Sequence, residues 1–334
     1  MADLEGSLDR LAAATGFSGV VRVDRDGQLE LARAYGLAHR GLDLPNTVDT
    51  RFAVASGTKG LTALTVASLL EEGRLDLATT ARSVLGADLP LVDDRVTVEQ
   101  LLAHRSGIGD YVDEETIDSA TDYLMPVPVH RLATTEDYLA VLEGHPQSFP
   151  PGERFAYNNS GFVVLALIAE RVGGAPFAEL VRSRVCDPAG MGDTEFLRSD
   201  EPAARTALGY LEPEGLRTNV LHLPVRGSGD GGIYTTAADV HALWSALDAG
   251  RIVPAEQVAD MLRPRSDVPA ESLRYGLGFW LHPTSDAVVL IGADAGVSFR
   301  TVHDRAAGVT HTVLANTTDG AWPVARLLQE LLTP

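Results

Sequence analysis

The sequence predicts an α+β protein in which an antiparallel β-sheet flanked by helices carries an inserted, mainly helical second domain. Strand-like segments occupy the two ends of the chain, at residues 20–32 and 276–315. Between them, residues 76–227 show helical periodicity interrupted by proline and glycine. We therefore expect residues 1–75 and 228–334 to form the sheet domain, residues 76–227 to form the helical domain, and a cleft to separate the two.

The first two strands are predicted by an alternating segment, residues 20–32, which Asp26 and Gly27 interrupt. Asp-Gly between alternating apolar residues is the strongest short-range signal for a β-hairpin. The next element is a helix, because residues 61–70 are apolar or small on nearly all sides. That composition is typical of a helix buried all round, and Gly73 is expected to end it.

The middle of the chain predicts short helices and one long loop. Residues 98–108 indicate a short helix that ends in a turn. Residues 161–171 indicate a second buried helix, which Asn159 or Ser160 can cap. Residues 112–129 are acidic and contain proline, and we expect them to form a surface loop or lid.

Four further strands are predicted near the end of the chain, at residues 276–281, 287–291, 297–303 and 309–315. Short turns join them, so neighbouring strands should run antiparallel. A helix is expected from Ala321 to Leu332. Together with the N-terminal hairpin, these strands should form one sheet with the terminal helices on its face.

Composition limits the possible partners and locations. The formal charge of −19 argues against nucleic acid or an anionic membrane as partner, since either would need a basic face. Residues 1–19 lack the pattern of a secretory signal, and no window of about twenty apolar residues occurs, so we expect a cytoplasmic protein. The single cysteine, Cys186, excludes an internal disulfide and a cysteine-based metal site. The sequence does not predict the oligomeric state.

Lys59 is the only lysine in the chain, because every other residue in the Lys+Arg count is an arginine. A lysine ammonium can lose its proton near neutral pH when it is desolvated, whereas a guanidinium cannot. Ser56 precedes it by three residues, so on a helix the hydroxyl and the amine lie on one face. A neutral amine in that place can take the serine proton as the hydroxyl attacks a carbonyl, and burial at a helix N-terminus should lower the pKa of Lys59.

Two motifs carry a resemblance to a known family. Residues 56–59, Ser-Gly-Thr-Lys, and residues 157–159, Tyr-Asn-Asn, resemble those of the serine β-lactamase and penicillin-recognising enzyme superfamily. The most similar branch is class C-like and includes family VIII-type esterases, D-aminopeptidases, D,D-peptidases and transacylases. Residues 101–107, 151–153, 188–194, 231–239 and 275–279 also resemble it. The resemblance implies a β-lactamase/transpeptidase-like fold with the active site in the cleft between the domains.

The resemblance also implies roles for individual residues. Ser56 would form a covalent acyl-enzyme, Lys59 and the Tyr157 phenol would share the proton transfers, and Asn159 would bind the substrate amide or Lys59. A tyrosine with an ordinary pKa near 10 needs an adjacent cation to act as a phenolate, and Lys59 is the one lysine available. The alternative for Tyr157 is a buried tyrosine whose hydroxyl has a structural partner.

The third family motif is a lysine or histidine, any residue and then glycine on a strand, and here the chain departs from it. Residues 292–299 occupy the place, which puts Ala293 at the position of the cation. In the family that cation helps to bind a substrate carboxylate, so its absence argues against β-lactamase and D,D-carboxypeptidase activity. An alternative register puts Asp294 there and favours an amine-bearing or neutral substrate. A backbone N–H at Gly296 or nearby would form the oxyanion hole together with the N–H of Ser56.

The function predicted first is a serine hydrolase acting on small esters or amides, and the expected partner is a small-molecule ester, amide or short peptide substrate. A D-aminopeptidase or related peptidase, an acyltransferase with a non-water acceptor, and a non-catalytic binding protein are the alternatives. The chain has no Gly-x-Ser-x-Gly elbow and no His-Glu-x-x-His pair, which disfavours other hydrolase folds and zinc catalysis. Accordingly, we expect no metal and no cofactor.

Overall fold

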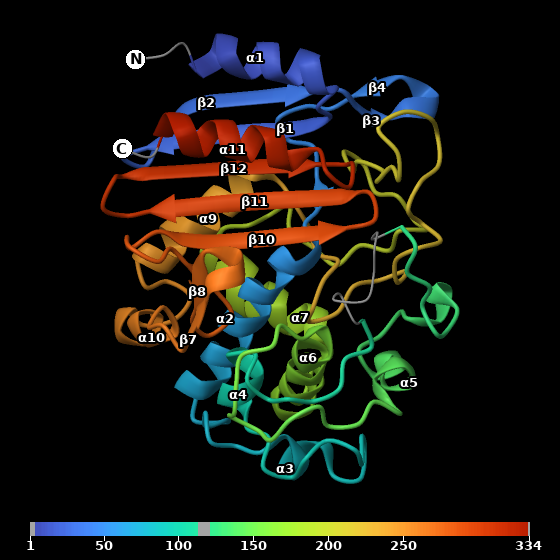
Figure 1. The fold of residues 1–334 in the computed structure, drawn as a ribbon, viewed down its shortest axis with the longest axis vertical. Coiled ribbons are helices and arrows are strands. Elements are labelled where there is room, and N and C mark those ends of the chain that lie inside the picture. The colour runs from blue at the N-terminus through green and yellow to red at the C-terminus, as the bar shows by residue number, and fades with distance from the viewer. Residues whose placement is uncertain (1–3, 113–120, 333–334) are drawn as a thin grey trace.

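The computed structural model describes residues 4–112 and 121–332. Within these ranges an eight-stranded antiparallel sheet has the order β2-β1-β12-β11-β10-β9-β8-β7 (Figure 1). Its strands are β1 (Gly19–Arg25), β2 (Gln28–Tyr35), β7 (Ser266–Val268), β8 (Leu273–Tyr275), β9 (Trp280–Leu281), β10 (Val288–Asp294), β11 (Val297–Asp304) and β12 (Val309–Ala315). Two short pairs lie outside it, β3 (Leu37–His39) with β4 (Leu44–Pro45) and β5 (Phe52–Ala53) with β6 (Tyr234–Thr235). The predicted α+β class and the antiparallel sheet are confirmed.

The N-terminal hairpin joins the C-terminal strands as predicted. Asp26 and Gly27 connect β1 to β2 with φ values of 50° and 73°, which suit the turn of a tight hairpin. Strand β1 pairs with β12 from Gly19 opposite Ala315 onward. Strands β7 and β8 were not predicted, because each spans only three residues and the glycines that follow β8 hide any alternation.

Helices cover both faces of the sheet. Helices α1 (Leu4–Thr15) and α11 (Ala321–Leu332) pack on one face, where Leu8 and Leu328 join Val21 and Val313 in a buried cluster. Helices α2 (Thr58–Glu71) and α9 (Ala237–Asp248) lie on the other face. There the Trp244 indole N–H donates to Thr301 Oγ1 at 3.0 Å, which fixes α9 on β11.

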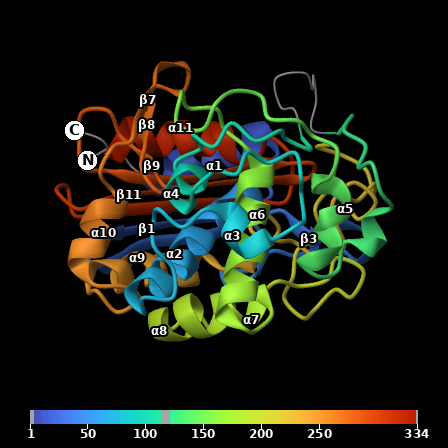
Figure 2. The same ribbon diagram turned by 90° about the horizontal axis from the view of Figure 1, so that it is seen from below.

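The remaining helices lie away from the sheet, in the lower half of Figure 1 and across the view in Figure 2. They are α3 (Ala81–Leu85), α4 (Val98–Leu102), α5 (Leu139–Leu142), α6 (Asn159–Gly173), α7 (Phe177–Val181) and α8 (Asp187–Ala189). Helix α10 (Ala255–Met261) follows α9 and lies beside β7 and β8. A continuous apolar core runs from Leu290 and Phe299 on the sheet through α2 to α6. The division into two domains at residues 75/76 and 227/228 therefore stays a prediction.

Helix α6 is buried over most of its length, as predicted, but it begins two residues earlier than expected. Its N-cap is Asn158, whose Oδ1 accepts the N–H of Gly161 at 2.6 Å, and neither Asn159 nor Ser160 has that role. No single helix in the described ranges has both the length and the apolar composition to cross a bilayer. The pair Asn159–Gly173 and Phe177–Ala189, bent by 81°, meets that criterion only when taken together.

The loop predicted at residues 112–129 is described only in part. Residues 113–120 lie outside the described residues, so the prediction of a lid stays a prediction. Residues 121–128 form turns and irregular backbone, and Leu124 within them is 84% exposed. The Tyr123 hydroxyl donates to the Tyr111 carbonyl at 2.7 Å and ties this segment to the chain that precedes it.

A buried carboxylate docks α9 on β1. Asp24 is 2% exposed, accepts two hydrogen bonds from Arg22 at 2.7 and 2.8 Å, and lies 3.2 Å from His241 Nδ1. Burial by itself would raise the pKa of Asp24, but the interactions with His241 and Arg22 outweigh it and lower that pKa below 3.8. The ionised carboxylate therefore contributes stability that is present above its unfolded pKa and is lost as the pH falls through the folded pKa.

Replacing Asp24 by asparagine should lower the free energy of unfolding at pH 7 by about 3 kcal/mol, because Arg22 and His241 lose a buried anion. Urea denaturation at pH 7 and at pH 3 measures the effect. The difference from wild type should shrink at pH 3, because Asp24 of the unfolded chain is then largely protonated and the stability contributed by the ionised carboxylate falls as the pH approaches the folded pKa. An equal change in Asp286→Asn, whose side chain is exposed, or a difference that does not depend on pH would contradict this account.

Candidate active site

Ser56 lies in a 3₁₀ turn, Ala55–Gly57, between β5 and α2. Ala55 has a φ of 42°, a left-handed conformation that residues other than glycine rarely adopt. The Gly57 N–H donates to the Val54 carbonyl at 2.8 Å, and Thr58 Oγ1 donates to the Ala55 carbonyl at 2.7 Å. The surrounding bonds thus hold a strained turn that presents the Ser56 hydroxyl at the start of α2.

Strand β10 passes directly against this turn. A Cβ atom at Gly292 would lie 1.9 Å from the Val54 carbonyl oxygen and 3.0 Å from the Gly57 nitrogen, so only glycine allows this approach. Strand β9 pairs with β10 only at Val288 and Val289. The rest of the β10 edge therefore faces the turn that carries Ser56.

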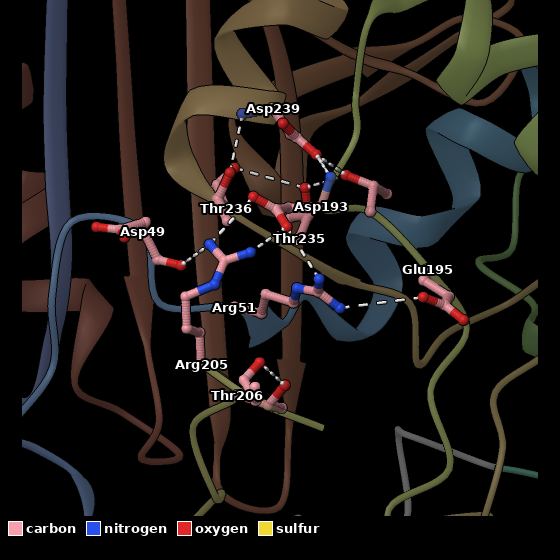
Figure 3. A network of polar contacts seen from close by, with 11 residues as sticks. Asp49, Arg51, Asp193, Glu195, Arg205, Thr206, Thr235, Thr236 and Asp239 are labelled. Carbon is pink, nitrogen blue, oxygen red and sulfur yellow. Dashed lines mark hydrogen bonds and ion pairs between the residues drawn. The ribbon is translucent and has the colours of Figure 1, made fainter. Parts of the chain in front are cut away.

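A polar network anchors the chain just before the turn (Figure 3). Arg51 donates to Asp193 Oδ1 at 2.9 Å, and Arg205 binds the same carboxylate. The N–H of Asp193 and the hydroxyl of Thr194 both donate to Asp239 Oδ2 at 2.8 Å. Because Asp239 is on α9 and Arg51 immediately precedes β5, the network fixes β5, and with it the Ser56 turn, against α9.

Lys59 is buried in contact with Ser56. Its Nζ lies 2.9 Å from Ser56 Oγ, 2.8 Å from Asn159 Oδ1 and 2.8 Å from the carbonyl oxygen of Asp230, and the residue is 2% exposed. An amine can donate to only two of these groups while its lone pair faces the third, whereas an ammonium can donate to all three. The spacing of Ser56 and Lys59 thus brings their functional groups together, as the sequence predicts.

Tyr157 packs beside Lys59. The Lys59 Nζ lies 4.9 Å from the centroid of the Tyr157 ring, and that ring stacks on Trp280 at 6.1 Å with an interplanar angle of 13°. The His104 ring lies on it as well, at 4.4 Å. These contacts fix the orientation of the tyrosine next to the amine, while its role in proton transfer stays a prediction.

His104 is a site residue that the sequence did not single out. It is 1% exposed, and its Nδ1 accepts the N–H of Asn158 at 3.1 Å. Burial, and next the charge of Lys59, hold the pKa of His104 well below its ordinary value, so the ring is neutral at neutral pH. The resemblance of residues 101–107 to the family was the one signal that marked this segment.

Asp110 is a second residue that the sequence did not identify. Its Oδ2 accepts the N–H of Asn159 at 2.7 Å, and its Oδ1 accepts the N–H of Ser160 at 2.9 Å. Burial raises the pKa of Asp110, although these hydrogen bonds oppose the change. A carboxylate at the first turn of α6 suits the helix dipole and fixes the backbone of Asn159, whose side chain binds Lys59.

The loop before β6 supplies another hydrogen-bond acceptor for Lys59. The Asp230 carbonyl binds Lys59, and its carboxylate accepts the hydroxyl of Tyr111. Burial raises the pKa of Asp230, opposed chiefly by the charge of Lys59. Thr62 Oγ1 donates to the Gly229 carbonyl at 2.7 Å and holds the loop on α2. The glycine-rich sequence of this loop, residues 227–232, indicates a turn but not which of its groups meet the lysine.

The structure changes the assignment of the third motif. Of the glycines in this hairpin, Gly292 is the one at which a Cβ atom would collide with the turn that carries Ser56. The family motif, which is a cation, any residue and then glycine, therefore aligns with residues 290–292. The cation position is therefore Leu290, which is 3% exposed and packs against Gly60 of α2. Ala293 is exposed, because its side chain alternates to the other face of the strand. The side chain of Asp294 lies on the same face of the strand as Gly292, and it lines a cavity beside Ala55.

Gly296 does not occupy the position expected of an oxyanion donor, because its N–H donates to Thr318 Oγ1 at 3.0 Å. Asp294 and Val297 flank the two-residue connection between β10 and β11, and such flanking residues exchange backbone hydrogen bonds. Backbone groups alternate along a strand, so the N–H of Ala293 points to the opposite, open edge of β10. That edge faces the Ser56 turn.

The antiparallel sheet flanked by helices, with a serine and a lysine one helical turn apart at the start of a buried helix, defines the class of β-lactamases and penicillin-binding proteins. The beta-lactamase family model matches residues 5–332, and the chain belongs to this family. The structure of a penicillin-binding protein from Bacillus halodurans superposes with a TM-score of 0.91 at 34% identity, covering 97% of this chain and 99% of that one. The resemblance predicted from the two motifs is confirmed.

Relatives in this family differ in the activity that their names state. Esterase EstB of Burkholderia gladioli is 31% identical over an alignment of 296 positions that covers 78% of this chain and 73% of that protein. The D-aminopeptidase of Brucella anthropi is 28% identical over 80% of this chain but only 50% of its own length. The putative penicillin-binding protein PbpX of Bacillus subtilis is 28% identical, and the match spans 81% of this chain and 63% of that protein.

Proposed function

We propose that this protein is a serine hydrolase that forms an acyl-enzyme on Ser56 and hydrolyses small esters or amides. The observation that carries the proposal is the contact of 2.9 Å between Lys59 Nζ and Ser56 Oγ, at a buried site where Asn159 and Asp230 fix the amine. An oriented amine beside a hydroxyl is the arrangement that activates a serine nucleophile.

In the proposed reaction Ser56 Oγ attacks the substrate carbonyl carbon, and its proton passes to the neutral amine of Lys59. The tetrahedral intermediate then collapses, the bond to the leaving group breaks, and that group takes up the proton. Tyr157, stacked beside the amine, is the group proposed to pass this proton on. Water then attacks the carbonyl carbon of the acyl group and gives a proton to the amine of Lys59. The bond between that carbon and Ser56 Oγ breaks, and the proton returns to Ser56.

The oxyanion of the intermediate needs two N–H donors near Ser56. We assign the first to the N–H of Ser56 at the start of α2 and the second to the N–H of Ala293 on the open edge of β10. The support for Ala293 is the strand register, together with the close approach of Gly292 to the turn. The side chain of Ala293 has no part in this proposal.

The proposal is tested by labelling with a fluorophosphonate. Intact-mass spectrometry should find one label per chain, and peptide mapping should place it on Ser56, because among the described serines Ser56 is the one in contact with Lys59. Ser56→Ala should take up no label. A label on another serine, or equal labelling of the alanine variant, would overturn the mechanism.

We expect β-lactams to be poor substrates. A charge-assisted hydrogen bond to a carboxylate contributes about 1.5 to 3 kcal/mol. Here the cation position holds Leu290, and Asp294 lies four residues further along the strand on the same face. The kcat/KM for a neutral p-nitrophenyl ester should therefore be about a hundredfold higher than for a chromogenic cephalosporin. The ratio should fall in Asp294→Asn. Equal turnover of both substrates by wild type would show that another group binds the carboxylate.

A peptidase acting on amine-bearing substrates is the second candidate, and a specific observation favours it. Asp294 lies on the wall of the cavity beside Ala55, where it can attract a cation. The relative named as a D-aminopeptidase makes this candidate compatible with the family.

A further inference from the structure

A cavity opens beside the Ser56 turn, and its wall is acidic and aromatic. Ala55, the residue before Ser56, forms one side of it. Asp230 and Asp294 supply two carboxyl groups, and Tyr111, Tyr138 and Tyr234 supply three phenol rings. Among the described residues that line this cavity, none is basic. Carboxylates together with aromatic faces are the surroundings that favour a cationic group.

The two acids lie close enough to act on one group. The charges of Asp230 and Asp294 both contribute, after burial, to raising the pKa of the Tyr138 hydroxyl. Tyr138 donates that hydroxyl to the Arg226 carbonyl at 2.7 Å, so its position on the wall is fixed. The Asp230 carboxylate accepts the hydroxyl of Tyr111, and Asp294, whose Oδ1 accepts the N–H of Ala295 at 2.8 Å, is the acid on the strand side of the cavity.

Asp294 lies close along β10 to Gly292, the residue that approaches the Ser56 turn. It lies on the face of β10 that Gly292 turns toward the Ser56 turn, and two residues along a strand span about 6.6 Å. A substrate whose carbonyl group meets Ser56 would therefore place a group a few bonds away beside this carboxylate. The Ser199 hydroxyl on the same wall is shielded from solvent and has no hydrogen-bond partner among the described residues, so it can accept from a bound donor.

We propose that this cavity binds a primary ammonium group carried on an apolar or aromatic body, with Asp294 as its anion. The inference rests on the proposed function, because it makes amine-bearing esters or amides the preferred substrates of the Ser56 site. Leu197, Leu223 and Val225 on the cavity wall would contact the apolar body of such a substrate.

Matched ligands test the proposal on the intact protein. 2-Phenylethylammonium, 2-phenylethanol and 3-phenylpropionate present an ammonium, a neutral hydroxyl and a carboxylate on the same aromatic body. Each would be titrated as a protectant of Ser56 against fluorophosphonate. The ammonium should protect at a concentration at least tenfold lower than the alcohol, and the carboxylate should be weakest. Equal protection by all three, or strongest protection by the carboxylate, would overturn the proposal.

Variants assign the effect to Asp294. In Asp294→Asn the ratio between ammonium and alcohol should fall to about one, whereas Asp286→Asn, an exposed acid just before the same strand, should keep the wild-type ratio. Because the ratio is taken within each variant, a change in the labelling rate does not affect it. A preference that survives in Asp294→Asn would remove Asp294 from the site.

Failure of the proposed function would be distinguishable from failure of this inference. If fluorophosphonate does not label Ser56, the hydrolase proposal fails. Calorimetric titration of the wild-type protein with the same three ligands then still measures the affinity of the cavity for each of them. Tighter binding of the ammonium by at least tenfold would then support the cavity assignment alone. Calorimetry that finds no preference for the ammonium would refute it.

Discussion

Replacing Lys59 by methionine should lower kcat/KM for ester hydrolysis at least a thousandfold. The thioether has a similar length but cannot take the proton of Ser56, and general base catalysis contributes about two to four decades of rate. Methionine is the cleaner substitution, because the bulkier guanidinium of arginine would have to fit at a residue that is 2% exposed. Arginine also cannot accept a proton, so Lys59→Arg should be inactive as well.

A control separates proton transfer from support of the loop. Thr62→Val removes the hydrogen bond to the Gly229 carbonyl and so loosens the same loop that Lys59 binds through Asp230. Its kcat/KM should fall less than tenfold. Thermal unfolding would check that each variant is folded. Activity of Lys59→Met within tenfold of wild type would exclude Lys59 from the proton path.

Replacing Gly292 by alanine should lower kcat/KM more than a hundredfold. The added methyl carbon would lie 1.9 Å from the Val54 carbonyl oxygen, so either β10 or the Ser56 turn must shift by more than 1 Å. A displacement of that size at a catalytic group costs about two decades of rate. The readouts are ester kinetics and the rate of fluorophosphonate labelling.

The neighbouring position provides the matched control for Gly292. Ala293→Ser also adds one heavy atom to β10, but on the exposed face, and it keeps the backbone N–H assigned to the oxyanion. It should retain activity within a few fold of wild type. If Gly292→Ala is as active as Ala293→Ser, then the approach of β10 does not fix the position of the nucleophile.

The parts of the site that the sequence predicts are those set by local spacing. Ser56 and Lys59 are three residues apart on a helix, so their contact follows from helical geometry alone. Asp110 and Asp230 reach the same site through backbone hydrogen bonds across long stretches of chain, and no periodicity marks them. Their roles become visible only when α6 and the loop before β6 are placed against α2.

The third motif shows why a strand is harder to assign than a helix. Residues 290–296 contain two glycines, and either can serve as the glycine of the motif until the strand register is known. A shift of one residue along a strand moves a side chain to the other face. For this reason Ala293 is exposed, whereas Asp294, the next residue, lies on the cavity wall. The close approach of Gly292 to Val54 decides the register, and that contact joins segments far apart in the sequence.

The pairing of β1 with β12 has a consequence for how the chain acquires its structure during synthesis. The hairpin of β1 and β2 leaves the ribosome long before β12, the partner of β1, has been synthesised. Until then β1 presents an open edge of unpaired backbone groups, which is a surface prone to wrong pairings. Contacts between residues as distant as Gly19 and Ala315 also form slowly. Completion of the sheet must therefore wait until β12 has been synthesised, and a chain that stops short of β12 would leave both β1 and β11 without their shared neighbour.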